Sequence, residues 1–270
     1  MSHELRDLTR TIALEAGSLA RRLRAEGVEV AASKSTPVDV VTVADRETEL
    51  LIRRRIAEAR PQDGILGEEG GVEGGDSGIT WVVDPIDGTV NYLYGIPHYA
   101  VSIAVVEGDA DPLTWNALAA AVVNPASGEL YTAAHGEGAE LDGTAIRVAE
   151  PVELSQALLA TGFAYNAETR GHQGAVIARL LPEVRDIRRQ GTASLDLCFV
   201  GNGRYNAYFE RTLSPWDHAA GALIAREAGA AVRGRNGAAP DRDFMLAAHP
   251  DVADRLEERL LALGAADFAI

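Results

Sequence analysis

The 270-residue sequence lacks several features that indicate particular classes of protein. It has one cysteine, Cys198, which excludes an intrachain disulfide and a cysteine-based zinc site. No apolar run approaches the roughly 18 residues of a membrane helix. The first residues lack the basic-then-apolar pattern of a secretory signal. We therefore expect a cytoplasmic protein that does not enter a membrane.

Basic residues are also scarce. The chain has 25 lysines and arginines against 40 acidic residues, which gives a formal net charge of −15. Such a charge repels nucleic-acid phosphates and anionic membranes, so nucleic acid is not expected as a partner. It would also repel a phosphorylated substrate unless cations lay between substrate and protein. The acidic balance agrees with a site that collects divalent metal ions.

The first part of the chain predicts two helices followed by strands. Apolar residues at three- and four-residue spacing indicate a helix from Leu5 to Leu23, ending near Gly27. A second helix is expected between Pro37 and Pro61, and the Gly- and acid-rich segment 64–78 is expected to be a loop. Strand-like segments with an Asp142-Gly143 hairpin turn follow, over 80–84, 100–107, 118–124 and 129–135.

Strands and helices alternate in the second part. Strands are expected over 157–161, 186–190, 205–210 and 244–248, and helices over 171–181, 193–200, 216–228 and 251–263. This alternation indicates an α/β unit. We therefore expect an α+β half over 1–150 and an α/β half over 151–270, packed as one body.

The segment from Trp81 to Thr89 (WVVDPIDGT) carries the clearest chemical signal. Asp84 and Asp87 bracket Pro85, and a strand is expected to stop sharply at this Asp-Pro step. Two carboxylates this close repel each other unless a proton or a cation lies between them. Hard oxygen ligands favour Mg²⁺, Mn²⁺ or Ca²⁺.

Gly88 and Thr89 follow directly. Glycine lets a backbone approach an anion closely, and the next residues can begin a short helix whose free N–H groups face it. The fragment alone fits a simple turn with a helix cap equally well. Singly, Glu68 also fits a solvated loop acid, and Asp217 fits a cap of the next helix.

Together, five segments resemble the inositol monophosphatase family of the metal-dependent, lithium-sensitive phosphatase superfamily. They are Lys34–Thr42 (KSTPVDVVT) with Asp45, Gly67–Glu69 (GEE), Trp81–Asn91 (WVVDPIDGTVN), Gly191–Ala193 (GTA), and Trp216–Gly221 (WDHAAG) with Glu227–Gly229 (EAG). The resemblance implies a layered α-β-α-β-α sandwich of the sugar-phosphatase type, commonly a homodimer. It also implies two to three Mg²⁺ ions per site, for which Mn²⁺ can substitute.

The resemblance implies a role for each matching residue. Glu68, Asp84 and the Ile86 carbonyl would hold a first metal; Asp84, Asp87 and Asp217 would hold a second; and Glu68 would help to hold a third. Asp45 and Thr89 would orient and deprotonate the attacking water, and the Gly88 and Thr89 amides would bind phosphate. Asp87, Ala193, Glu210 and Arg211 would contact the substrate. Attack by the water would be direct, without a phosphoenzyme.

Several other residues allow a chemical and a structural interpretation. Lys34 fits a phosphate contact or a surface lysine, and Arg211 fits an anion contact or a surface salt bridge. We favour structural roles for His98 and His218 and a core position for Cys198. Val90 and Asn206 depart from residues frequent in the family, and these departures affect substrate identity more than reaction class.

The expected function is hydrolysis of a small polyol or sugar monophosphate, with myo-inositol 1-phosphate as the leading candidate. Histidinol phosphate, fructose 1,6-bisphosphate and 3′-phosphoadenosine 5′-phosphate are alternatives within the same fold. A different class of function is a protein-binding regulator of the RNA machinery, as some relatives of the family are. The complete acidic set argues against a catalytically inactive chain.

Overall fold

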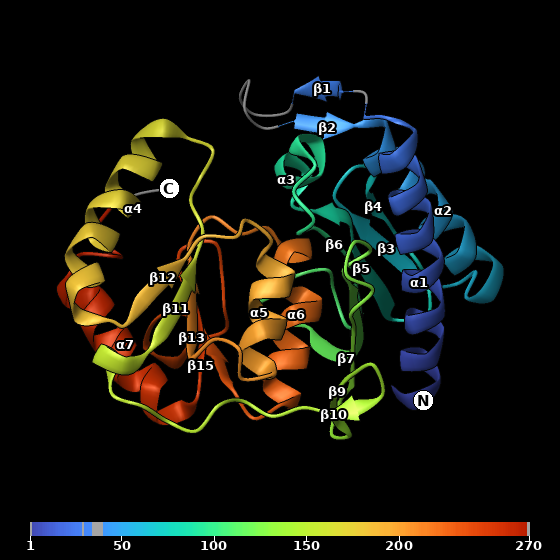
Figure 1. Ribbon diagram of the computed structural model, residues 1–270. Helices are drawn as coiled ribbons and strands as arrows, with labels where there is room; N and C mark the ends of the chain where they lie inside the picture. Colours follow the sequence, from blue (N-terminus) through green and yellow to red (C-terminus); the bar gives the residue numbers. More distant parts are fainter. Residues whose placement is uncertain (1, 29, 34–39, 269–270) are drawn as a thin grey trace.

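The computed structural model describes residues 2–28, 30–33 and 40–268, which form alternating layers of helices and sheets (Figure 1). Two helices cover the outer face of an eight-stranded sheet, two lie between it and a five-stranded sheet, and two cover the outer face of the second sheet. The helices of these three layers are, in order, α1 (Ser2–Glu26) and α2 (Val43–Ala59), α5 (Ala193–Gly201) and α6 (Pro215–Glu227), and α4 (Ala167–Leu180) and α7 (Pro250–Ala262). The predicted α-β-α-β-α sandwich is confirmed.

The eight-stranded sheet is antiparallel except where β3 pairs with β5. Its strands are, in sheet order, β10 (Thr144–Ala145), β9 (Gly138–Leu141), β8 (Leu130–Ala134), β7 (Asn116–Val123), β6 (Ala100–Glu107), β5 (Ile79–Asp87), β3 (Gly64–Gly67) and β4 (Gly71–Glu73). A separate antiparallel pair consists of β1 (Val30–Ser33) and β2 (Val40–Thr42). The short helix α3 (Thr89–Tyr94) directly follows β5.

The five-stranded sheet is mixed. Its order is β12 (Asp186–Arg188), β11 (Leu158–Thr161), β13 (Ala207–Glu210), β15 (Met245–Ala248) and β14 (Ala231–Arg233). Strands β12, β11 and β13 run parallel, and β15 is antiparallel to both of its neighbours. Short 3₁₀ helices lie at η1 (Leu154–Gln156), η2 (Leu181–Glu183) and η3 (Arg235–Gly237).

The central helix α5 is buried along its whole length. Its apolar residues pack into one cluster with side chains of β5, β6 and β7 on one side and β13 and β15 on the other. This shared core joins the two parts of the chain into one body, and a boundary near residue 150 stays a prediction. In the described part of the chain, no helix combines the length and the apolar character of a membrane span.

For three segments, the predicted bounds or the predicted type of structure were wrong in part. The second helix begins at Val43, because the three residues before it pair with β1 as a strand. The strand expected to stop at Asp84 continues to Asp87. The segment 64–78, expected to be a loop, contains β3 and β4, which depend on pairing with β5 rather than on local sequence.

The hairpin turn, the bounds of one strand and the apolar face of the first helix are confirmed. Asp142 and Gly143 both have positive φ, at 51° and 78°, and connect β9 to β10. Positive φ at both central residues is the requirement of the type I′ two-residue hairpin turn, which Asp-Gly satisfies readily. The strand expected over 100–107 has these bounds in the structure, and the first helix has the expected apolar face.

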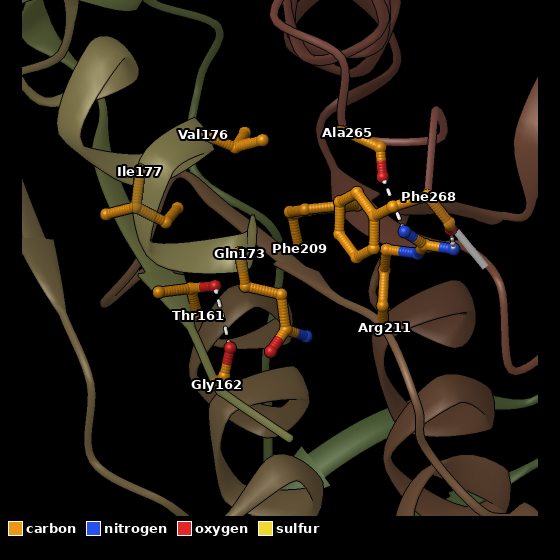
Figure 2. Close-up of a pocket in the computed structure, with 9 residues that line it drawn as sticks. All are labelled: Thr161, Gly162, Gln173, Val176, Ile177, Phe209, Arg211, Ala265 and Phe268. Carbon is orange, nitrogen blue, oxygen red and sulfur yellow. Dashed lines mark hydrogen bonds between the residues drawn. The ribbon is translucent and has the colours of Figure 1, made fainter. Parts of the chain in front are cut away.

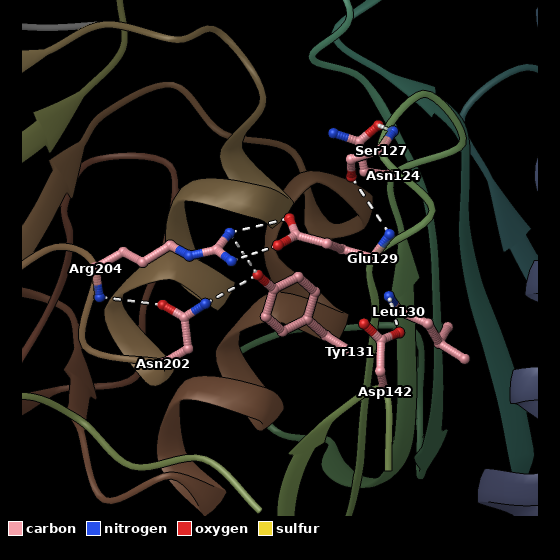
Figure 3. Close-up of polar contacts among 8 residues, drawn as sticks. All are labelled: Asn124, Ser127, Glu129, Leu130, Tyr131, Asp142, Asn202 and Arg204. Atoms are coloured by element: carbon pink, nitrogen blue, oxygen red, sulfur yellow. Dashed lines mark hydrogen bonds and ion pairs between the residues drawn. The ribbon is translucent and has the colours of Figure 1, made fainter. Parts of the chain in front are cut away.

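A polar cluster joins the eight-stranded sheet to the loop after α5 (Figure 3). Arg204 forms a two-pronged ion pair with Glu129 and donates to the Tyr131 hydroxyl at 3.1 Å. Asn202 donates to the same hydroxyl at 2.9 Å, and the Arg204 guanidinium lies 4.8 Å from the ring centre of Phe199. The cluster therefore bridges two elements that are distant in the sequence.

Candidate active site

The predicted acidic motif lies at the end of β5, where the strand carries a β-bulge. Asp84 pairs with Ser102 of β6 and Asp87 pairs with Ala100, so an extra residue of β5 lies between the two pairs. A bulge bends the strand and re-aims the side chains around it. Pro85 is tolerated here because β3 pairs with β5 only upstream of it, so no neighbour on that side needs its missing N–H. Asp84 and Asp87 are both buried at this bulge.

Asp45 lies in the first turn of α2, where it forms a capping box with Thr42. Its Oδ2 accepts the Thr42 backbone N–H at 2.8 Å and the Thr42 hydroxyl, and its Oδ1 lies 3.0 Å from the Thr89 hydroxyl. Burial raises the pKa of Asp45 to about 6, against the opposing effect of the Thr42 bonds, and the charge of Glu68 raises it further. Asp45 and Thr89 are therefore in direct contact, as a shared role in proton transfer requires.

Asp84 faces two acidic side chains from other elements, Glu68 from the β3–β4 turn and Asp217 from α6. Burial raises the pKa of Asp84 well above its usual range, and the charges of Glu68, Asp87 and Asp217 raise it further, as does a hydrogen bond with Glu68. Burial and the charges of Glu68 and Asp87 likewise raise the pKa of Asp217. We call Glu68, Asp84, Asp87 and Asp217 the carboxylate cluster.

Asp87 connects the eight-stranded sheet to the start of α5. Its Oδ2 accepts the Ser194 backbone N–H at 2.7 Å and the Ser194 hydroxyl at 2.5 Å. Burial raises the pKa of Asp87 to about 6, and the Ser194 donors and the Ala193 backbone N–H limit this rise. The Ala193 amide, which is expected to contact substrate, thus also lowers the pKa of a carboxylate in the cluster.

Asp217 is held at the start of α6. Its Oδ2 accepts the backbone N–H of Ser214 at 2.6 Å, as a capping residue in the first turn does. Asp84 likewise accepts the Ile86 N–H at 3.1 Å. Each bond fixes a carboxylate to its own element, α6 or β5, while leaving lone pairs on each group.

The carboxylate cluster matches a hard divalent cation in the chemistry of its donors. All of its ligand atoms are oxygen, and its charges raise one another's pKa, so a cation would relieve their repulsion. Within residues 2–28, 30–33 and 40–268, however, no three acidic, histidine or cysteine side chains are arranged to hold one ion as they stand. Asp84 and Glu68 are instead hydrogen-bonded to each other.

Gly88 joins β5 to α3 in a conformation that only glycine adopts readily, with φ at +92°. A Cβ at this position would lie 2.5 Å from the Thr192 hydroxyl. Thr89 begins α3 and is partly exposed, as is Gly88. The predicted short helix after the motif is confirmed, and it lies beside the loop that leads into α5.

Glu210, which the sequence predicts to contact substrate, lies at the end of β13. Its Oε2 accepts the hydroxyl of the buried Tyr208 at 2.6 Å. Burial raises the pKa of Glu210 to about 7, while the Tyr208 bond and the charge of Arg189 act in the opposite direction. The charge of Asp87 also raises this pKa, which indicates that Glu210 faces the carboxylate cluster.

The expectation that Arg211 contacts substrate is not supported by its position. Its side chain is 3% exposed, and its guanidinium donates to the backbone carbonyl of Asp243 at 2.6 Å. It also donates to the carbonyls of Ala265 and Phe268, each at 3.0 Å (Figure 2). It also lies 4.1 Å from the centre of the Phe268 ring. Because its donors are directed at the chain's own carbonyls, Arg211 holds the C-terminal segment and is turned away from solvent.

Two residues for which the sequence favours a structural role, His218 and Cys198, are buried. His218 is buried, and burial lowers its pKa to about 4, so it is neutral at pH 7. Cys198 is a buried free thiol. Lys34 and the segment 34–39 lie outside the described residues.

The sequence did not predict the contacts that Thr42 and Ser194 make with the site carboxylates. The spacing of Thr42 and Asp45 is a recognisable capping signal, whereas nothing local to Ser194 indicates its contact with Asp87.

Comparisons with known proteins agree over nearly the full chain. The model of the inositol monophosphatase family matches residues 1–266. An inositol-1-monophosphatase of Mycobacterium leprae is 46% identical, over 94% of this chain and 92% of the relative. The Nus factor SuhB of Xylella fastidiosa is 41% identical, over 84% and 83%. The solved structure of Mycobacterium tuberculosis SuhB is 42% identical, with a TM-score of 0.82 and coverage of 98% of both chains.

Proposed function

The chain belongs to the inositol monophosphatase family and is a phosphatase, and we propose that it uses Mg²⁺ to hydrolyse a small polyol or sugar phosphate, with myo-inositol 1-phosphate as the leading substrate. The observation that carries the proposal is the carboxylate cluster, in which acidic side chains from three elements face one another. Such a cluster is unfavourable without protons or cations.

Glu68, Asp84 and the Ile86 carbonyl would hold a first Mg²⁺, and Asp84, Asp87 and Asp217 a second. Glu68 would also help to hold a third, and Mn²⁺ would substitute. When bound, such ions stabilise charge on phosphoryl oxygens and lower the pKa of water toward neutrality. The oxygen-only donor set and the burial of Asp84 and Asp87 support this assignment.

Asp45 and Thr89 would handle the proton of the attacking water. The Thr89 hydroxyl lies 3.0 Å from Asp45 Oδ1 and is partly exposed, so it can accept a proton from water as it donates its own to Asp45. The pKa of Asp45, about 6, suits a group that is ionised near neutrality and can take up a proton. Thr42 fixes the other oxygen of this carboxylate, so Oδ1 remains directed at Thr89.

The phosphate and the alcohol would lie on opposite sides of the carboxylate cluster. Backbone N–H groups of Gly88 and Thr89 would bind phosphate where β5 passes into α3. Glu210 would accept hydrogen bonds from substrate hydroxyls, and the Ala193 amide would donate one. The effect of the Asp87 charge on the pKa of Glu210 supports this arrangement, because it indicates that Glu210 lies near the carboxylate cluster.

Asp84→Asn tests the proposal, because it removes one charge from the cluster while keeping the side chain's shape. We expect Mg²⁺-dependent phosphate release to be abolished. The metal-free variant should melt at a higher temperature than the metal-free wild type, because repulsion is relieved. Mg²⁺ should stabilise the wild type and not the variant. The exposed Asp109→Asn is the matched control, and Mg²⁺-dependent activity equal to that control would contradict the proposal.

The substrate can be identified by phosphate release from a small panel. The compounds are myo-inositol 1-phosphate, histidinol phosphate, fructose 1,6-bisphosphate and 3′-phosphoadenosine 5′-phosphate. We expect the highest kcat/KM with myo-inositol 1-phosphate. A higher value with any of the other three would replace it as the proposed substrate without changing the reaction class.

A second candidate function is a protein-binding role in the RNA machinery, which the name Nus factor SuhB of several relatives supports. In this case the chain would act through a partner protein, since its charge of −15 disfavours direct contact with RNA. Complementation of a deletion strain by Asp84→Asn would favour this role, and failure to complement would favour catalysis. The homodimer, the cytoplasmic location and lithium sensitivity expected from the sequence stay predictions.

A further inference from the structure

The turn between β3 and β4 carries Glu68 and is bound from one side by Glu49 of α2. Glu49 Oε2 accepts the backbone N–H of Glu69 at 2.8 Å, and its Oε1 accepts the N–H of Gly70 at 2.8 Å. The Glu49 side chain is buried, although it contributes no atom to the carboxylate cluster as we have defined it. A buried carboxylate that accepts consecutive backbone N–H groups fixes the conformation of the turn.

Arg53, one helical turn after Glu49, binds the other end of the same turn. Its Nε donates to Glu49 Oε1 at 2.7 Å, and its Nη2 donates to the Gly71 carbonyl at 2.7 Å. Its Nη1 also donates to Glu73 at 3.2 Å. The two side chains thus form a clamp over the turn, and the charge of each is compensated within it.

A side chain at either flanking glycine would have to displace the clamp from the turn. A Cβ at Gly67 would lie 2.4 Å from Glu49 Oε1. A Cβ at Gly70 would lie 2.7 Å from both Glu49 Oε1 and Arg53 Nη2. The glycines that flank the acid pair are therefore explained by contact with α2, since neither has a positive φ.

The opposite side of the turn is fixed to β5. Gly67 pairs with Val83, and the Glu68 N–H donates to the Val83 carbonyl at 3.2 Å, one residue before Asp84. The position of Glu68 relative to Asp84 thus depends on β5 on one side and on the clamp on the other. The hydrogen bond between these two carboxyl groups reflects that placement.

We propose that Glu49 and Arg53 are positioning residues that hold Glu68 in place for Mg²⁺ binding, without contacting metal or substrate themselves. This inference rests on the proposed function, in which Glu68 is a metal ligand. Partners that orient metal ligands typically change metal affinity by about 10- to 100-fold when they are removed. The clamp should therefore affect Mg²⁺ affinity more than it affects the KM of the substrate.

The test compares Glu49→Gln with Glu47→Gln, the same substitution at an exposed position of α2. The amide of Gln cannot accept from all three N–H donors, so the turn loosens. Calorimetric titration of the full chain with MgCl₂ should show affinity about tenfold weaker in Glu49→Gln only. Hydrogen exchange at the Glu69 and Gly70 amides should be faster, while KM at saturating Mg²⁺ should match the control. Mg²⁺ affinity and exchange rates equal to those of the control would overturn the inference.

Arg53→Met provides a second variant that leaves the Glu49 acceptors in place. It should weaken Mg²⁺ binding in the same direction and to a smaller extent, and unchanged Mg²⁺ affinity would overturn the part of the inference that concerns Arg53. Glu68→Gln separates this inference from the proposed function. If Glu68→Gln binds Mg²⁺ as the wild type does, both the proposed metal role of Glu68 and the inference about the clamp are overturned. If Glu68→Gln weakens binding while Glu49→Gln matches its control, only the clamp is overturned.

Discussion

At the scale of single residues, Glu210 is oriented by one hydroxyl group and one glycine. The Tyr208 hydroxyl donates to its Oε2 at 2.6 Å, and a Cβ at Gly162 would lie 2.0 Å from the same oxygen. A side chain at residue 162 would therefore displace the carboxylate. Because the Tyr208 ring is buried, its hydroxyl reaches Glu210 without competition from bulk water. The acceptor proposed for substrate hydroxyls is thus held in one orientation.

Tyr208→Phe should weaken recognition of polyol substrates. Loss of one hydrogen bond of about 1 kcal/mol corresponds to about a fivefold higher KM for myo-inositol 1-phosphate. The kcat/KM for p-nitrophenyl phosphate should not change, because this ester has no alcohol hydroxyl for Glu210 to bind. Tyr131→Phe, another buried tyrosine, is the control. An equal effect on both esters would mean that Tyr208 acts on the fold rather than on Glu210.

The site residues that could be predicted are those that share a contiguous motif or a family pattern. Asp84 and Asp87 are three positions apart, so their proximity follows from the sequence alone. Ser194 lies 107 residues from Asp87, and its contact exists only because α5 packs against the end of β5. Arg211 shows the converse. Its place beside Glu210 suggested a substrate contact, but its side chain turns to the opposite side of the strand, toward the C-terminal segment.

At the scale of elements, β5 is fixed near its start by a buried aspartate. Asp63 accepts from Arg60 Nε at 2.8 Å, from the Ser77 hydroxyl at 2.7 Å and from Trp81 Nε1 at 3.0 Å. These donors come from the end of α2, the loop before β5 and β5 itself. The strand that carries the carboxylate cluster is thus tied to the helix that carries Asp45.

Asp63→Asn should lower the free energy of unfolding by about 2 kcal/mol at pH 7, since hydrogen bonds to a charged group are lost. Burial alone would raise the pKa of Asp63, but the bonds from Arg60, Ser77 and Trp81 lower it overall. A carboxyl with a lowered folded pKa stabilises the protein above its unfolded pKa, near 4, and this contribution is lost as the pH falls through the folded pKa.

The difference between wild type and Asp63→Asn should therefore shrink below about pH 4, as measured by urea unfolding at several pH values. The exposed Asp76→Asn is the matched control. A difference that persists unchanged at low pH would show that the charge of Asp63 does not stabilise the fold.

Elements with a strong local pattern were predictable, and elements that depend on pairing were not. The apolar face of α1 follows from its helical periodicity, and the bounds of β6 follow from a continuous apolar run. Three of the four three-residue strands among the described residues, β2, β4 and β14, were not expected, because they have too few residues to establish a period and their neighbours in the sheets define them. The start of α2 was misplaced for this reason, because a strand precedes it directly.

At the scale of the whole molecule, the site lies where the two sheets and the central helices meet. Asp84 comes from the eight-stranded sheet, Asp217 from α6 and Glu210 from the five-stranded sheet. The same helices supply much of the shared core between the sheets. The relative position of the two sheets therefore determines both the stability of the core and the geometry of the site.

The ion pair of Arg204 and Glu129 should contribute to the docking of these parts. A double-mutant cycle with Arg204→Met and Glu129→Gln should give a coupling of about 1 kcal/mol in the free energy of unfolding. The coupling should decrease in 1 M salt, because both side chains are partly exposed. The exposed pair Arg188 and Asp186 within β12 is the comparison and should show no measurable coupling. Equal coupling for the two pairs would contradict a docking role.

The bulge in β5 has a consequence for how this chain can change in evolution. Side chains alternate between the two faces of a strand, so a single-residue insertion or deletion between Ile79 and Asp84 would turn Trp81 from the core under α1 and α2 to the opposite face of the sheet, or move both aspartates out of register. Substitutions that preserve the alternation leave this relation intact. Among homologues, we therefore expect alignment gaps in the loops on either side of β5 and none within the strand.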